Sequence, residues 1–364
     1  MITSSIFMSN TVVLLALLIG QGSSFESFKF PNFSFGNNGG TDAGATKSSN
    51  GKSLQPGDTV AVVGASGNVG KLVALRLSDT YKVNGIVRDS DSVKSFFKGR
   101  EDRISLFETD LLDEVKSKLT TVEDDYNSIP DKNSCPDSLY PALCNANAIV
   151  ICTGTTAFPT QAWSRNGQFS IVQEVLNALL SSKFNVSQAL QLLDSKGLNT
   201  PKNVDDRANK LVLDAWNVAS KVNKKRGIML SSIGVKRRES MPFPILNACG
   251  VLDAKAAGEQ ALQEAAVKGD FSYTILRPGQ LNGGPYDNNY YLGTLFELDM
   301  DTQTRAVDIG RGDELLGDTL RSTIAEVTAQ LMEGDFARDM DFAVVNIKGD
   351  APTAETLQTQ LTAL

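Results

Sequence analysis

The chain contains no histidine. This absence excludes catalytic triads that use histidine, metal sites with histidine ligands and switches that depend on imidazole titration near neutral pH. The four cysteines show no C-x-x-C spacing, so they indicate neither a zinc site nor a dithiol redox motif. Cys135 and Cys144 could pair across a loop, but we expect isolated thiols at these positions and at Cys152 and Cys249. We expect no bound metal.

An excess of basic residues is also absent: 35 Lys and Arg face 42 Asp and Glu, which gives a net charge of −7. Because nucleic acids attract basic surfaces, we expect no nucleic-acid partner. The apolar run at 11–20 is uncharged but too short to span a bilayer comfortably as a helix. We therefore expect no integral membrane span in the mature protein.

The first 57 residues have the composition of a targeting segment. The small residues Gly22, Ser23 and Ser24 follow the apolar run, and this pattern predicts a signal peptide over residues 1–24. Residues 25–57 are rich in Ser, Gly, Asn and Phe and poor in acids, which is typical of an unstructured, transit-like segment. The Gly-Ser-Ser-Phe junction at 22–25 resembles the two-part plastid presequences of diatoms and related algae. That resemblance implies import into the plastid stroma, with the secretory pathway as the alternative.

A short apolar run, 60–63, is followed by a glycine-rich turn and a helical pattern. Such a run is typical of a strand buried on both faces of a parallel sheet. Of the glycines that follow at three-residue steps, Gly64 permits a tight turn, Gly67 lets the backbone approach a pyrophosphate, and Gly70 lets helix and strand pack closely. The N-terminus of the helix adds N–H donors and a positive dipole end. The stretch therefore predicts a dinucleotide phosphate site.

Strand patterns and helical patterns alternate along the rest of the chain, which predicts an α/β fold with a doubly wound parallel sheet of the Rossmann type. We expect one large NAD(P)-binding domain over residues 58–350, a polar connection at 113–145, an inserted helical segment at about 157–200, and a C-terminal tail at 351–364. Further strands are expected over 81–87, 104–107, 148–152, 228–230, 273–276 and 342–347, and helices over 204–222, around Lys255 and over about 319–332.

Arg88 and Asp89 end the second expected strand, where the adenosine ribose of a dinucleotide lies in this fold. An acidic residue at this point accepts hydrogen bonds from the NAD ribose, whereas an arginine accommodates the 2′-phosphate of NADP. Arg88 comes first, and its planar guanidinium suits a phosphate. We expect NADP as the cofactor, and Asp89 leaves NAD as the alternative.

Taken together, these motifs resemble the atypical short-chain dehydrogenase/reductase family, in the group with NmrA-like and plastid NAD(P)-binding proteins. The resemblance covers about residues 58–350. It rests on 64–70, 87–89, 110–111, 153–155, 201–205, Asn209, 231–232, Lys255 and 276–279. It implies that residues 110–111 flank the adenine, that 153–154 lie beside the ribose and phosphates, and that 278–279 lie near the nicotinamide. The residues expected to bind the cofactor are Gly64, Ala65, Ser66, Gly67, Asn68, Val69, Gly70, Arg88, Asp110, Leu111, Thr153, Gly154, Lys255, Pro278 and Gly279.

The chain departs from the family at one position. Catalytic members carry a tyrosine four residues before the lysine; the tyrosine transfers a proton, and the lysine lowers its pKa and binds ribose. Here that position is Val251, and valine cannot transfer a proton. Ser232 and Lys255 remain as catalytic candidates. Two functions follow: a plastid NADP-dependent oxidoreductase with a small-molecule substrate, or a non-catalytic NAD(P)-binding redox sensor or assembly scaffold for photosynthetic complexes.

Overall fold

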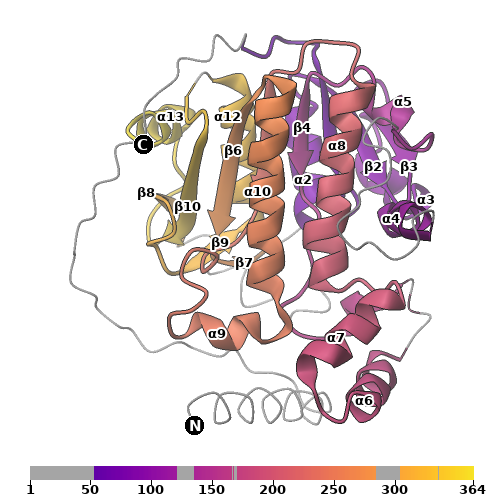
Figure 1. Ribbon diagram of the computed structural model, residues 1–364. Coiled ribbons are helices and arrows are strands. Elements are labelled where there is room, and N and C mark those ends of the chain that lie inside the picture. The colour runs from indigo at the N-terminus through magenta and orange to yellow at the C-terminus, as the bar shows by residue number, and fades with distance from the viewer. Residues whose placement is uncertain (1–52, 121–134, 166, 168–169, 284–303, 335) are drawn as a thin grey trace.

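The computed structural model describes residues 53–120, 135–165, 167, 170–283, 304–334 and 336–364. The presequence expectations fall on residues that lie outside this part, apart from the last few before 58. The described chain forms an eight-stranded sheet between two layers of helices (Figure 1). The predicted α/β fold with a doubly wound, mostly parallel sheet is confirmed.

The strands of the main sheet lie in the order β3-β2-β1-β4-β5-β6-β10-β8. All neighbours pair in parallel except β10 and β8, which are antiparallel. The strands are β1 Thr59–Val63, β2 Lys82–Val87, β3 Ile104–Glu108, β4 Ala148–Ile151, β5 Arg226–Leu230, β6 Ser272–Pro278, β8 Ala306–Arg311 and β10 Met340–Ile347. Two short strands, β7 Gln280–Asn282 and β9 Asp318–Leu320, pair separately.

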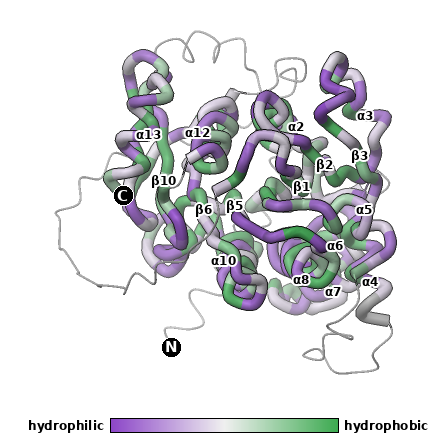
Figure 2. The backbone as a smooth tube through the Cα atoms, turned by 90° about the horizontal axis from the view of Figure 1, so that it is seen from above, coloured by the Kyte–Doolittle hydropathy of each residue, from purple (hydrophilic) through white to green (hydrophobic). Residues whose placement is uncertain are grey.

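The central strand β1 explains why helices cover both faces of the sheet. Its apolar residues alternate between two cores: Val60 and Val62 lie in one, Ala61 and Val63 in the other, and all four are fully buried. The first core is covered by α2 Asn68–Leu77, α12 Arg321–Glu333 and α13 Ala354–Thr362, and the second by α4 Leu111–Thr120, α5 Tyr140–Leu143, α8 Asn209–Ala219 and α10 Val251–Gly269. Figure 2 shows α2 and α12 on one side of the strands and α8 and α10 on the other.

The segment expected as a polar connection contains two helices, so that expectation was wrong for its described part. In α4, Leu112 and Val115 are buried at helical spacing, and Asp113 and Glu114 lie in the first turn, where they complement the helix dipole. Residues 121–134 lie outside the described chain. The final stretch, 351–364, forms α13, whose Leu357 is buried against the core.

The inserted segment folds as a helical hairpin with its own small core. Helix α6 covers Ile171–Ser181, close to the helical run expected there, and α7 covers Val186–Ser195. Trp163 is fully buried in this core together with residues from both helices. Figure 1 shows α6 and α7 beyond the edge of the sheet toward which β6 and β10 point.

Candidate functional site

The strand order reverses between β1 and β4. From β1 the sheet continues to β2 and β3 on one side, and to β4 and the remaining strands on the other. Doubly wound sheets bind ligands in the crevice beyond the carboxyl ends of the strands at such a reversal. Gly64 follows β1 and Thr153 follows the end of β4, and a Cβ on Gly64 would lie 3.0 Å from Thr153 Cγ2. The two turns therefore meet at the crevice.

The three glycine positions of the turn after β1 differ in how strictly the backbone requires glycine. Gly64 has a φ of +78°, a conformation that favours glycine. A Cβ on Gly70 would lie 2.1 Å from Gly64 O, so the turn and α2 pack too closely for any side chain. Gly67 has a φ of −71°, and a Cβ there would meet only Gly64 O, at 3.3 Å. The fold itself therefore requires glycine at 64 and 70, whereas a side chain at 67 would need Gly64 O to shift by only a few tenths of an ångström.

The N-terminus of α2 is open to an anion. No side-chain oxygen caps the helix, and its first turn contains no acidic residue. The N–H of Gly67 donates to Gly64 O at 2.9 Å, and Gly67 and Asn68 are exposed while Ser66 is half-buried. Ala65 and Val69 are buried in the core, so only their backbones can face a ligand. Backbone N–H groups and the helix dipole both favour a phosphate at this point.

At the end of β2, Arg88 and Asp89 differ in what they contact. Arg88 is exposed, and within the described chain its side chain makes no hydrogen bond or ion pair. Asp89 Oδ1 accepts hydrogen bonds from the backbone N–H groups of Asp91 and Ser92, at 3.0 and 3.4 Å, where the short helix α3, Asp91–Lys94, begins. One oxygen of the Asp89 carboxylate is thus bonded to its own loop, and the guanidinium of Arg88 is available.

Asp110 and Leu111, expected beside the adenine, lie at the start of α4. Asp110 Oδ1 accepts a hydrogen bond from Leu112 N at 3.0 Å, and Leu111 is buried in the core. Arg165 of the inserted segment forms ion pairs with Asp110 and with Asp113, the latter at 2.8 Å. The same guanidinium holds the pKa of the Asp113 carboxyl below its usual value. The sequence analysis missed Arg165, because nothing in the local pattern relates it to residues more than fifty positions earlier.

Beyond β4, Thr153 lies against the glycine turn and Gly154 lies against Lys255. Thr153 Oγ1 donates to Asn209 Oδ1 at 2.5 Å. A Cβ on Gly154 would lie 3.2 Å from both Asp205 Oδ1 and Lys255 Nζ, which are themselves 2.8 Å apart. The structure therefore brings the predicted residues 64, 153, 154 and 255 close together.

Val251, four residues before Lys255, is buried in an apolar cluster with Ile233 and Phe243. Ser232 Oγ lies 3.0 Å from Ile233 O, and in the described chain no hydrogen bond joins Ser232 to Lys255.

Each of the four cysteines is a free thiol, and burial raises the pKa of Cys249 to about 12.

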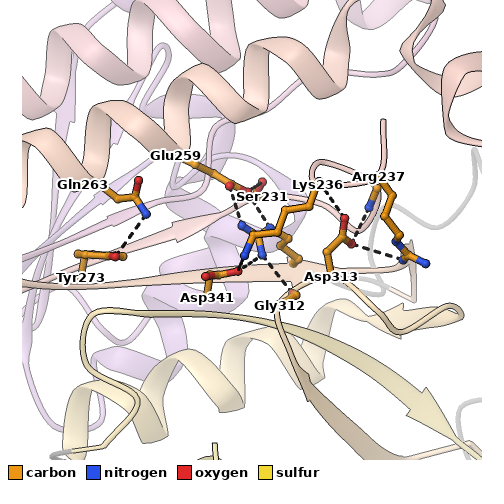
Figure 3. Close-up of polar contacts among 11 residues, drawn as sticks. Ser231, Lys236, Arg237, Glu259, Gln263, Tyr273, Gly312, Asp313 and Asp341 are labelled. Carbon is orange, nitrogen blue, oxygen red and sulfur yellow. Dashed lines mark hydrogen bonds and ion pairs between the residues drawn. The ribbon is translucent and has the colours of Figure 1, made fainter. Parts of the chain in front are cut away.

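A buried ion-pair network holds α10 against the sheet. Arg277 of β6 is fully buried and donates to both carboxylate oxygens of Glu259, at 2.9 and 2.7 Å, and also pairs with Asp341 of β10. Ser231 Oγ donates to Glu259 Oε1 at 2.5 Å. Figure 3 shows Glu259, Ser231 and Asp341 converging between the helix and the strands. Glu259 lies four residues after Lys255, so the network anchors the turn of α10 that follows this lysine.

Pro278 and Gly279, expected near the nicotinamide, follow the same strand. Pro278 O accepts a hydrogen bond from Ile233 N at 2.9 Å. A Cβ on Gly279 would lie 1.8 Å from Gly317 O, so glycine is required there by the close approach of two backbones. This pair stands at the carboxyl end of β6, and its relation to a nicotinamide stays a prediction.

A cavity of about 580 Å³ opens between α7, the segment 200–207 and the start of α10. Its walls include Asp206, which follows Asp205, and Ala254, which precedes Lys255. Neither Asp205 nor Lys255 itself lines this cavity.

Comparison with known protein families matches residues 131–333, more than half of the chain, to the family described as NAD(P)H-binding. The chain belongs to the NAD(P)H-binding family. The matched range includes Thr153, Gly154, Asp205 and Lys255 and begins after the glycine turn. No curated protein matches the chain.

Solved structures with a similar fold are distant in sequence. The oxidoreductase ylbE from Lactococcus lactis is 17% identical, with a TM-score of 0.50 over 84% of this chain and 96% of that chain. ChuY, an anaerobilin reductase from Escherichia coli O157:H7, is 15% identical, with a TM-score of 0.46 over 79% and 96%. A short-chain dehydrogenase/reductase from Veillonella parvula in complex with NADP is 13% identical, with a TM-score of 0.44 over 81% and 99%. The similarity to ylbE concerns the fold alone.

Among the described residues, no helix is both long and apolar enough to cross a membrane.

Proposed function

We propose that this protein of the NAD(P)H-binding family is an NADP-dependent oxidoreductase that acts on a small molecule. The observation that carries the proposal is the open N-terminus of α2. Gly67 is exposed there, no side chain caps the helix, and the fold places little demand on glycine at this position. Close approach of a pyrophosphate accounts for a glycine that the fold does not require.

The choice of NADP rests on Arg88. Its guanidinium is exposed and uses none of its donors within the described chain, whereas one oxygen of Asp89 accepts the backbone N–H groups of Asp91 and Ser92. A free guanidinium at the end of β2 suits the 2′-phosphate, and a carboxylate already occupied by backbone donors is less able to accept the ribose hydroxyls.

When bound, the nicotinamide would donate a hydride to the substrate or accept one from it. The residues of this chain bind and orient. Lys255 Nζ would donate to the ribose, and the hydroxyl of Ser232 would contact the substrate. The family tyrosine is replaced by a buried valine, so the proton that accompanies hydride transfer comes from a group other than residue 251.

The phosphate site is tested by Gly67→Asp. The added carboxylate would occupy the space of the pyrophosphate and repel it, so we expect NADPH to bind at least about tenfold more weakly, on the order of 1.4 kcal/mol. The φ of Gly67 suits any residue, so the variant should fold. Calorimetric titration with NADPH gives the dissociation constant, and thermal unfolding checks the fold. An unchanged affinity in a folded variant would remove the phosphate site from this turn.

Catalysis is tested by incubating the pure protein with NADPH and candidate metabolites and following the nicotinamide absorbance. Steady oxidation that requires a substrate would support an enzyme. Tight binding without turnover, across a broad set of carbonyl and alkene substrates, would contradict this part of the proposal.

A second candidate function, a redox sensor or an assembly scaffold, is favoured by one observation. The inserted helix α6 exposes Val172, Leu176 and Leu180 on one line, and Phe184 follows with a φ of +63° and nearly half of its surface exposed. A bulky residue held in this strained conformation and turned to solvent is unusual. Under this function, Leu176→Ser with Leu180→Ser would abolish assembly with a protein partner and leave NADPH affinity unchanged.

We also propose that residues 1–57 direct the protein to the plastid stroma. The support is the apolar run, the small residues before Phe25 and the acid-poor segment that follows.

A further inference from the structure

Lys255 does not stand alone at the crevice. Its ammonium lies 2.8 Å from Asp205 Oδ1, and the exposed fractions of the two side chains are 13% and 1%. Asp205 lies fifty residues earlier in the chain, in the segment Lys202–Ala208 that leads into α8. A carboxylate this deeply buried is costly unless it is paired and hydrogen-bonded, so its environment must be built to hold it.

Asp205 is held at its other atoms as well. Thr155 N donates to Asp205 Oδ2 at 3.1 Å, so one carboxylate bridges the loop after β4 and the lysine of α10. Asn209 Nδ2 donates to the backbone carbonyl of Asp205 at 3.0 Å, and the oxygen of the same amide accepts from Thr153. Loop, helix and lysine are thereby joined through two side chains.

The backbone around Asp205 is a π-helix, Lys202–Ala208. Such widened turns are rare and often occur at functional sites. Helix α10 packs directly against this turn, because a Cβ on Gly258 would lie only 2.5 Å from Asp205 O. The widened turn and the missing side chain together bring the carboxylate within reach of Lys255.

We propose that Asp205 is a positioning residue that aims the Lys255 ammonium at the ribose of the bound dinucleotide and ties its position to the 153–155 loop. The inference rests on the proposed cofactor site. Without Asp205, the lysine would swing toward solvent and the loop would lose the acceptor for its Thr155 N–H. Burial raises the pKa of the Asp205 carboxyl, and the ion pair with Lys255 opposes this effect.

The test is a double-mutant cycle on NADPH affinity with Asp205→Asn, Lys255→Met and the double variant. If Asp205 acts through Lys255, Asp205→Asn weakens NADPH binding at least about fivefold in the wild-type background and less than about twofold in the Lys255→Met background. A carboxylate with a merely structural role would cost the same factor in both backgrounds, and that result, or no loss at all, would overturn the proposal.

Asp206→Asn is the matched control. Asp206 is the next carboxylate of the same π-helix and pairs with Lys202 at the surface, so its removal should leave NADPH affinity unchanged. Asp205→Ser, which leaves room for a bridging water, replaces the asparagine variant if the latter does not fold. Wild-type protein that fails to bind NADPH would contradict the proposed function itself, whereas a non-coupled cycle in a protein that binds would contradict only the role of Asp205.

Discussion

Gly67 and Gly70 are three residues apart, and glycine occupies the two positions for different reasons. Gly70 is required by the turn, since a Cβ there would collide with a carbonyl at 2.1 Å, whereas Gly67 is exposed and lies in an ordinary conformation. The glycine pattern assigns Gly64 to the tight turn, Gly67 to the approach of a pyrophosphate and Gly70 to the close packing of helix and strand. The structure separates the glycines that make the turn from the one left open to a ligand.

Arg88 should decide between the two dinucleotides. A charge-assisted, bidentate contact with the 2′-phosphate contributes roughly 1.5–3 kcal/mol. At low salt, NADPH should therefore bind at least about tenfold more tightly than NADH. Arg88→Ala should weaken NADPH binding and leave NADH almost unchanged, and the preference should shrink as salt screens the exposed pair. Titration of both dinucleotides measures this.

Lys82→Ala serves as the control for Arg88→Ala, because this exposed cation begins the same strand at its opposite end. If the wild type binds NADH as tightly as NADPH or more tightly, Asp89 accepts the ribose hydroxyls and NAD is the cofactor.

Asp341 should make stability depend on pH. Burial acts to raise its pKa, but ion pairs with Lys236 and Arg277 outweigh burial and hold the pKa below its usual value. The folded state therefore binds this proton less readily than the unfolded state. The stabilisation is fully present above the ordinary aspartate value of about 3.9 and is lost as pH falls through the lowered value.

We expect Asp341→Asn to lower the free energy of unfolding by about 1–2 kcal/mol at pH 7 and by progressively less below about pH 4. Denaturant unfolding at several pH values measures the difference. The exposed Asp350→Asn is the control and should show no such trend. A difference that grows toward acid pH would contradict the assigned direction.

At the scale of elements, the sequence predicted the buried strands well but missed the antiparallel edge strand β8. Strands β1 and β4 are continuous apolar runs because both of their faces are covered. Strand β8 lies at an edge, pairs on one side only and buries a single residue, Val307, so its pattern is weak. Helix α7 was missed although its N-cap, Asn185, accepts a hydrogen bond from Gln188 N and is a recognisable signal.

From residue spacing alone, without the family resemblance, the candidate site was predictable only where its residues are contiguous. The glycine turn combines strand, turn and helix within thirteen positions and could be assigned from spacing. The Asp205–Lys255 pair joins two elements through a π-helical turn, and the helical period assumed in sequence analysis does not describe such a turn. Arg165 reaches Asp110 by way of the inserted segment, which likewise has no local signature.

The contact between α10 and the π-helix gives a prediction for these elements. In an isolated helix, alanine is favoured over glycine by about 1 kcal/mol. At Gly258 the added methyl would lie 2.5 Å from Asp205 O, so we expect Gly258→Ala to destabilise the protein by about 1–3 kcal/mol instead. Thermal unfolding measures this, with the exposed Gln260→Ala as the control. A rise in the melting temperature would show that the two elements are not in close contact.

At the scale of the whole molecule, the residues of the candidate site lie together beyond the carboxyl ends of the strands. Residues 64, 88, 153, 255 and 279 all lie at or near the carboxyl ends of strands or on a helix that packs over them. The inserted hairpin begins at this same end of the sheet. A hydrogen bond from Thr155 Oγ1 to Asn199 O, at 2.9 Å, joins the chain before the hairpin to the chain after it. A partner or substrate bound to the insertion would therefore lie close to the loop that Asp205 holds.

The presequence gives the last prediction, which concerns where the whole molecule acts. Residues 1–57 combine an apolar run, small residues and an acid-poor segment, and Phe25 stands where the first cleavage is expected. We expect residues 1–57 to carry a fluorescent reporter into the plastid of a diatom and the mature protein to begin at Phe25 or later. Phe25→Ala should hold the reporter in an outer compartment, because the resemblance to two-part presequences rests on this junction, whereas Phe28→Ala, three positions later, should leave import intact. Microscopy of the three reporters, with N-terminal sequencing of the imported protein, measures both steps. Cytosolic fluorescence from the intact presequence would refute the plastid address, and secretion of the reporter would assign residues 1–24 to a simple signal peptide.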